Sequence, residues 1–130
     1  MEFIQSGELP APAGHYSQAV AAGGLVFLSG ILPARDAVDP SAADFDIQCA
    51  SVFDQCEKVL RAAGCGLADV VQCTAYLAGV EHWPAFNTFY AGVFGDHRPA
   101  RAVVPVPALH HGFLVEVQLV AQRPGPGRAN

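Results

Sequence analysis

The segment from Phe113 to Val120 constrains the fold of this chain more than any other. If it forms a strand, its side chains alternate between two faces: Phe113, Val115, Val117 and Leu119 on one, Leu114, Glu116, Gln118 and Val120 on the other. The first set is wholly apolar and should pack on the core, whereas the second is partly apolar and still needs a cover. We therefore expect a sheet whose two faces both meet other protein.

Other segments complete this sheet. Strands are predicted at residues 25–29, 70–77 and 102–106, which are rich in β-branched, aromatic and other apolar side chains, and a shorter one at 18–22. The 25–29 segment follows a Gly-Gly turn. Apolar residues stand at its odd and its even positions, which point to opposite faces, so both of its faces should be buried.

Two segments have apolar residues at helical spacing, residues 44–63 and 83–94, and a glycine suited to a C-terminal cap follows each. Two helices can cover only one face of such a sheet. The other face then needs a partner, and a symmetric homo-oligomer is the economical source of one.

Composition narrows the function classes. The 130 residues fit one domain, predicted at 1–122, with a flexible Pro/Gly-rich tail at 123–130. A formal net charge of -5 argues against a nucleic-acid surface. No apolar run approaches the roughly 20 residues that cross a bilayer, and the first residues lack the features of a signal peptide. The expected location is the cytoplasm, without membrane or nucleic-acid partners.

The sequence also lacks the patterns of cofactor and metal enzymes. The four cysteines have no C-x-x-C spacing and are expected to be reduced core residues. The five histidines include no H-x-x-x-H pair, and no serine-nucleophile elbow or phosphate loop is present. The single lysine, Lys58, lies on the polar side of the first helix, so a Schiff base has no good candidate. We expect a site without metal or cofactor.

Two charged residues remain as candidates. Arg101 enters a predicted apolar strand, where a guanidinium needs an anionic partner, either a protein carboxylate or the carboxylate of a bound substrate. Glu116 lies between Val115 and Val117 on the face that the helices leave open. It is either catalytic or structural, the structural alternatives being an ion pair with Arg101 and a solvated sheet residue.

Several uncharged residues could join them. Tyr16 follows a Pro/Gly-rich loop and could offer its hydroxyl to a ligand, although packing under the sheet edge is commoner. Ser29 and Gly30 end a buried strand, where a glycine allows close approach to backbone N–H groups, or they form a simple turn. Asn87 interrupts the apolar stripe of the second helix and could equally be solvated.

In their order and spacing these residues resemble the Rid family, also called RidA/YjgF or L-PSP endoribonuclease-like. The resemblance covers about residues 10–121, and its motifs are Gly14–Val20, Val26–Gly30, Asn87–Tyr90 and Arg98–Arg101, with Glu116 fifteen residues after Arg101. It implies an α+β, chorismate-mutase-like fold: a mixed sheet with two helices on one face, and sheets facing inward in a homotrimer with clefts at the subunit boundaries.

The resemblance also implies residue roles. Arg101 would bind the substrate carboxylate and Glu116 would position water, with Tyr16 as a third catalytic residue; the substrate-binding positions would be Ser29, Gly30, Asn87 and Val103. The implied enzyme is a hydrolase that converts 2-aminoacrylate-type enamines and imines to 2-keto acids and ammonia. It needs no cofactor, because an iminium carbon is already electrophilic.

Some positions differ from the commoner family pattern. His15 stands where proline is usual, Val103 where many members have cysteine, and Leu109–Gly112 replaces a Leu-Pro-Lys-type loop. These differences concern the substrate more than the reaction. The alternatives are a pathway-specific relative such as a 2-aminomuconate deaminase, a trimer that binds small carboxylates without turnover, and the ribonuclease role in the family's older name.

Overall fold

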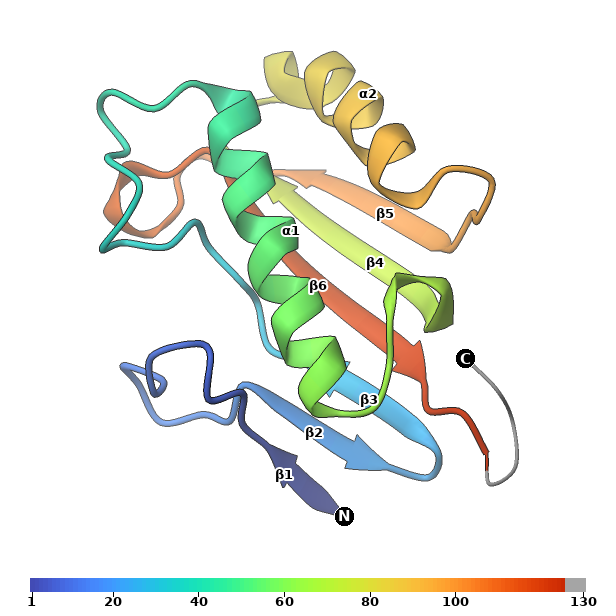
Figure 1. Ribbon diagram of the computed structural model, residues 1–130. Helices are drawn as coiled ribbons and strands as arrows, with labels where there is room; N and C mark the ends of the chain where they lie inside the picture. Colours follow the sequence, from blue (N-terminus) through green and yellow to red (C-terminus); the bar gives the residue numbers. More distant parts are fainter. Residues whose placement is uncertain (126–130) are drawn as a thin grey trace.

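Six strands form one mixed sheet in the order β1-β2-β3-β6-β4-β5 in the computed structural model, which describes residues 1–125 (Figure 1). Their bounds are β1 Glu2–Ile4, β2 Ala19–Ala22, β3 Leu25–Leu28, β4 Val70–Leu77, β5 Ala100–Pro105 and β6 Val115–Gln122. Only β4 and β5 pair in parallel. All the predicted strands are present, and β5 is an edge strand, as Pro105 suggests because proline cannot donate to a second neighbour.

The predicted helices are confirmed as α1, Phe45–Ala62, and α2, Trp83–Phe94. Asp44 caps α1 by accepting a hydrogen bond from the Ile47 N–H at 2.9 Å. Short 3₁₀ turns lie at Leu67–Asp69, Val80–His82 and His110–Gly112. Within residues 1–125, no helix is long and apolar enough to cross a membrane.

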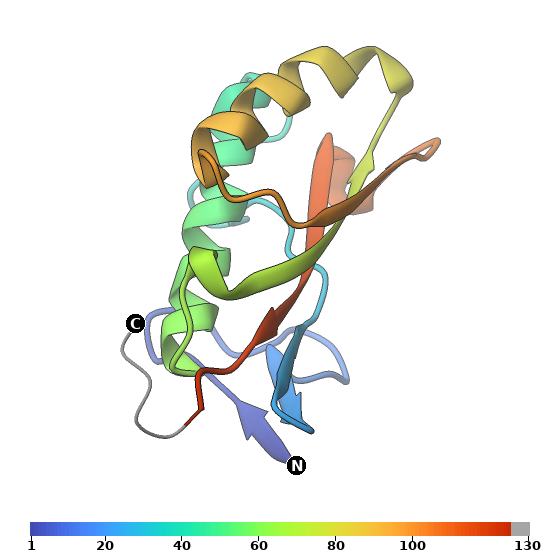
Figure 2. The same ribbon diagram turned by 90° about the vertical axis from the view of Figure 1, so that its right-hand side faces the viewer.

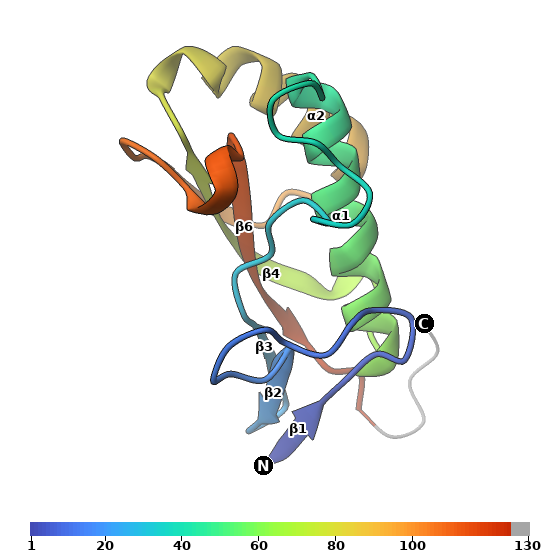
Figure 3. The same cartoon turned by 90° about the vertical axis from the view of Figure 1, so that its left-hand side faces the viewer.

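Both helices lie on the same face of the sheet, as expected (Figures 2 and 3). The alternation predicted for the last strand is confirmed on this side, where four side chains are almost wholly buried: Phe113, Val115, Val117 and Leu119. The four cysteines are buried and unpaired, as expected for core residues. Burial raises the pKa of the Cys73 thiol to about 12, so it stays protonated at neutral pH.

The other face of the sheet has no helix against it. Antiparallel pairing lines up a row of apolar side chains across four strands: Phe3, Val20, Phe27 and Val120. Phe27 is 44% exposed, so the expectation that both faces of its strand are buried is wrong for the chain by itself. The physical reason is that residues 1–125 supply no layer that covers this row.

Arg123, the first residue of the predicted tail, is bound to the rest of the chain. The Arg123 N–H donates to the Gly24 carbonyl at 2.9 Å, and the guanidinium bonds the Ala63 carbonyl at 2.8 Å and pairs with Glu2 at 2.8 Å. Arg123 is therefore anchored to the sheet and to the end of α1. The rest of the predicted tail, from residue 126 on, lies outside the described residues.

Candidate active site

Arg101 lies on the exposed edge strand β5 and is oriented by α2. Its Nη1 donates to the Asn87 Oδ1 at 3.0 Å, and its guanidinium carbon lies 4.8 Å from the centroid of the Tyr90 ring and 6.0 Å from that of Trp83. Such aromatic faces attract a cation. Within residues 1–125 Arg101 forms no ion pair.

Of the two anionic partners considered for Arg101, a protein carboxylate is therefore excluded within residues 1–125, and the carboxylate of a bound substrate remains open. The strand β5 is mostly exposed, so solvent screens the charge. An amide oxygen and two rings hold the guanidinium in place, and none of them neutralises it. Most of its donors remain available to an anion from outside the subunit.

Arg101 opens onto a hollow of about 460 Å³, whose lining residues are Asn87, Tyr90, Ala91, Phe94, Gly95, His97, Arg98, Pro99 and Arg101. The Tyr90 hydroxyl is buried near the Cys73 thiol, and burial raises its pKa, so the phenol stays neutral. No Asp or Glu lines the hollow, which is therefore positively charged.

Glu116 projects from the opposite face of the sheet. In the strand register, Glu116 lies opposite Tyr76 of β4, and Arg101 lies opposite Cys73 of the same strand. Residues 73 and 76 are an odd number of positions apart, so their side chains point to opposite faces of the sheet. The Cys73 side chain is buried under the helices, whereas Glu116 lies on the helix-free side between the buried Val115 and Val117.

This register decides what one subunit can do. The strand β4 separates β6 from β5, so Arg101 and Glu116 are two strands apart as well as on opposite faces. No ion pair joins them, which rules out that structural alternative for Glu116. Within a single subunit the two charges cannot contact the same small molecule.

Gly30 makes room for the Glu116 carboxylate. A Cβ atom built on Gly30 would lie 2.5 Å from Glu116 Oε2, closer than real Cβ contacts, so a side chain at position 30 would displace the carboxylate. The Gly30 N–H donates to no acceptor within residues 1–125 and is available to a ligand. Glu116 and Gly30, two of the predicted site residues, therefore lie together.

Tyr16, Ser29 and Gly30 line one pocket of about 250 Å³. The Ser29 hydroxyl donates to the Ser17 carbonyl at 2.6 Å, so what it can offer a ligand is an acceptor. Tyr16 is 54% exposed, not packed under the sheet edge. Three predicted site residues are thus brought together in a pocket that reaches α1 at Gln55 and Val59; the Glu116 carboxylate is not part of its lining but lies beside Gly30.

The remaining predicted residues lie on the Arg101 side. Asn87 contacts the guanidinium directly. The Val103 side chain lies two residues further along β5 and is partly buried against the core, which leaves its backbone, at the open edge of the sheet, to meet a ligand. The predicted site residues therefore fall into two groups within one subunit, here called half-sites: one with Arg101, Asn87 and Val103, the other with Tyr16, Ser29, Gly30 and Glu116.

Sequence reasoning missed two members of the second half-site. Arg35 and His111 line the same pocket as Tyr16. Nothing in the sequence marks Arg35, because an exposed loop arginine has no periodic pattern. His111 could have been noticed, since its loop departs from the family pattern. Among the residues that the structure describes, no three His, Cys, Asp or Glu side chains gather in a way that could hold a metal ion.

Comparisons with known proteins agree with this architecture. A RutC family protein of Pyrococcus horikoshii is 34% identical over 127 residues, which cover 94% of this chain and 98% of the relative. The RidA protein of an Antarctic Psychrobacter bacterium superposes with a TM-score of 0.83 at 32% identity, covering 94% of this chain and 99% of that one.

The crystal structure of Escherichia coli TdcF with bound serine superposes equally well, with a TM-score of 0.83 at 26% identity, covering 95% of this chain and all of that one, 100%. The profile of the protein family described as Endoribonuclease L-PSP matches residues 6–123. With its six-stranded sheet, two helices and these relatives, the chain belongs to the Rid family, of which Endoribonuclease L-PSP is the older description.

Proposed function

We propose that the protein is an enamine/imine deaminase that hydrolyses 2-aminoacrylate-type acids to 2-keto acids and ammonia. The observation that supports this most is the Arg101 guanidinium, which is held by Asn87 and the Tyr90 ring yet meets no carboxylate in the described part of the chain. A preorganised, unneutralised guanidinium suits bidentate binding of a small acid.

The reaction needs only these groups. An enamine first gains a proton on its β-carbon from solvent and becomes the iminium ion, whose carboxylate binds Arg101. Glu116 then accepts a proton from water while the water oxygen bonds to the C=N carbon and the C=N π electrons move to the nitrogen, which gives a neutral carbinolamine. The carbinolamine nitrogen takes that proton from Glu116, the hydroxyl gives its proton to Glu116, a C=O bond forms, and the C–N bond breaks to release ammonia. A positioned general base contributes roughly 10²–10⁴-fold.

The two half-sites would meet between subunits. Because Arg101 and Glu116 project from opposite faces of one sheet, a complete site takes Arg101 from one subunit and Glu116 from a neighbour. The uncovered apolar row that includes Phe27 and Val120 supplies a reason for subunits to associate there. We propose a homotrimer, which closes such a heterologous contact into a ring.

The relative with bound serine supports the ligand class. Serine is a small amino acid with a carboxylate, and the relative that binds it has the same fold across 95% of this chain. The acidic balance of the chain, with a net charge of -5, disfavours RNA as the substrate.

An imine-trapping assay tests the proposal. Imines are generated in situ by an amino-acid oxidase, semicarbazide traps the remaining imine, and several side chains are compared. We expect wild type to reduce the trapped imine, and Arg101→Ala to lose on the order of a hundredfold in kcat/KM. Arg61→Gln, which changes an exposed arginine of α1, serves as the control and should remain active.

Two results would overturn the proposal. Undiminished hydrolysis by Arg101→Ala would remove Arg101 from the site. Carboxylate binding without any acceleration of ammonia release by wild type would instead identify a non-catalytic binder. The side-chain profile of the wild type separates a general deaminase from a pathway-specific one, such as a 2-aminomuconate deaminase.

A further inference from the structure

The pocket that is lined by Tyr16, Ser29 and Gly30 also reaches a guanidinium other than that of Arg101. It lies between the loops on either side of these residues and α1, and its lining also includes Arg35 and His111. No Asp or Glu is among its lining residues; the Glu116 carboxylate reaches this region at Gly30. Its volume of about 250 Å³ is below the roughly 300–1,000 Å³ of sites for larger ligands.

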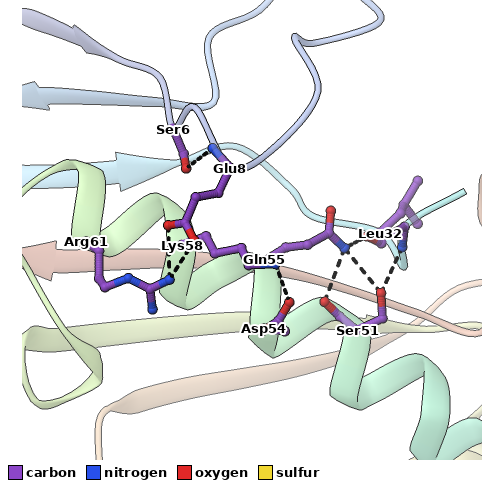
Figure 4. A network of polar contacts seen from close by, with 9 residues as sticks. Ser6, Glu8, Leu32, Ser51, Asp54, Gln55, Lys58 and Arg61 are labelled. Carbon is purple, nitrogen blue, oxygen red and sulfur yellow. Dashed lines mark hydrogen bonds and ion pairs between the residues drawn. The ribbon is translucent and has the colours of Figure 1, made fainter. Parts of the chain in front are cut away.

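The loop that bears Arg35 is fixed to α1. Ser51 Oγ accepts a hydrogen bond from the Ala34 N–H at 2.9 Å, and Gln55 Nε2 donates to the Leu32 carbonyl at 2.9 Å (Figure 4). Both bonds hold backbone just before Arg35. The guanidinium is therefore presented from a constrained loop, which lowers the ordering cost of binding an anion there.

Arg35 has no partner of opposite charge in the described part of the chain. Asp36 and Asp54 line the adjacent hollow. Asp54 pairs there with Lys58 at 2.9 Å (Figure 4). Arg35 lines both hollows, but only the one with Tyr16 lacks carboxylates of its own.

His111 adds a second group to the same pocket. Its backbone is in the left-handed region, at φ 63°, which is costly for a residue other than glycine and is tolerated mainly where the position is used. Burial lowers its pKa, and the charges of Arg35 and His110 lower it further. Arg35 and His111 thus line the same pocket, Arg35 as a charged guanidinium and His111 as a neutral imidazole that can donate a hydrogen bond to an anion.

We infer that this pocket binds a second acidic group, so that the preferred substrates are short imino acids with two carboxylates. One carboxylate would lie on Arg101 of a neighbouring subunit, and the other on Arg35 and His111. This inference rests on the proposed function, from which it takes the hydrolysis of the C=N bond. It adds the contacts that Arg35 and His111 would make with a second carboxylate. The two guanidinium groups would fix both ends of the molecule and so place its C=N carbon near Glu116.

Binding of stable product analogues tests the inference without turnover. Calorimetry compares 2-oxoglutarate, which has two carboxylates, with 2-oxobutanoate, which has one. Wild type should bind 2-oxoglutarate more tightly, and Arg35→Gln should reduce that preference on the order of tenfold, because one charge-assisted contact is lost. Arg61→Gln, which removes another exposed arginine, on α1, should leave the preference unchanged. Equal affinity of wild type for both acids would contradict the inference.

Kinetics separates this inference from the proposed function. The ratio of kcat/KM for an imino dicarboxylate to that for an imino monocarboxylate should fall in Arg35→Gln and in His111→Asn, which keeps a residue tolerant of the same backbone conformation. If wild type hydrolyses both imines equally while Arg101→Ala is inactive, the second-carboxylate site fails and the deaminase stands. If Arg101→Ala is fully active, the deaminase assignment itself fails.

Discussion

Glu116 is held beside the backbone of Gly30, and that contact is the tightest constraint on the candidate catalytic base. A Cβ at position 30 would lie 2.5 Å from Oε2, so only glycine allows the carboxylate to occupy its present place. The Gly30 backbone is outside the left-handed region, so the need for glycine there comes from the neighbour and not from strain. A substitution at position 30 should therefore lower activity while it changes stability little.

We predict that Gly30→Ala lowers kcat by on the order of tenfold or more, since the methyl group displaces a base that contributes roughly 10²–10⁴-fold. The free energy of unfolding should change by less than about 1 kcal/mol, because the flexible end of Glu116 can move aside. Urea denaturation and steady-state imine hydrolysis measure the two effects. Gly92→Ala on the exposed side of α2, where nothing lies within 4 Å, is the control and should keep wild-type kcat.

Helix α1 shows what sequence patterns could and could not predict about the elements. Its ends and its apolar stripe follow from local spacing, as do the long strands. The three-residue β1 is too short to leave a pattern. Strand order is not local either: β6 inserts between β3 and β4, so the opposite faces of Arg101 and Glu116 could not be derived from the sequence.

Gln48 is a second feature that spacing does not show. This helix residue is fully buried, with 0% exposure, and its Oε1 accepts a hydrogen bond from the Leu114 N–H at 2.8 Å. Its Nε2 donates to the Ala43 carbonyl at 3.3 Å. Gln48 thus joins the start of α1 to the residues that lead into β6, just after His111 and before Glu116.

We predict that Gln48→Leu destabilises the protein by about 1–3 kcal/mol, because it leaves the Leu114 N–H buried without an acceptor. Urea denaturation of wild type and Gln48→Leu measures this difference. Equal stability of wild type and Gln48→Leu would show that the hydrogen bond to Leu114 contributes nothing net.

At the scale of the whole molecule, the helix-free face of the sheet carries apolar side chains that no other layer covers within the described residues. The row Phe3, Val20, Phe27 and Val120 crosses four strands there, and no element of the described chain covers it. An apolar surface of this kind is normally buried between subunits. The sequence predicts such a partner, because apolar residues lie on both faces of its last strand. It does not show which contacts subunits would exchange.

Charge placed in this row should separate the subunits. We predict that Phe27→Glu shifts the protein from a trimer, three times 13.6 kDa, toward the monomer in sedimentation velocity experiments, since a buried carboxylate without a partner is costly. Ile47→Glu is the matched control, because Ile47 is 52% exposed on α1, on the other side of the molecule. A trimeric Phe27→Glu protein, or a monomeric wild type, would contradict the assignment of this face.

Mixed trimers test most directly the claim that Arg101 of one subunit and Glu116 of another act on the same substrate. Arg101→Ala and Glu116→Gln subunits are each expected to be inactive alone; they are then unfolded together, refolded at a 1:1 ratio and assayed for imine hydrolysis. A site shared between subunits predicts recovery of roughly a quarter of wild-type activity, because random assembly gives that fraction of clefts both intact residues. No recovery above the two separate variants, in trimers shown to be mixed, would contradict the account.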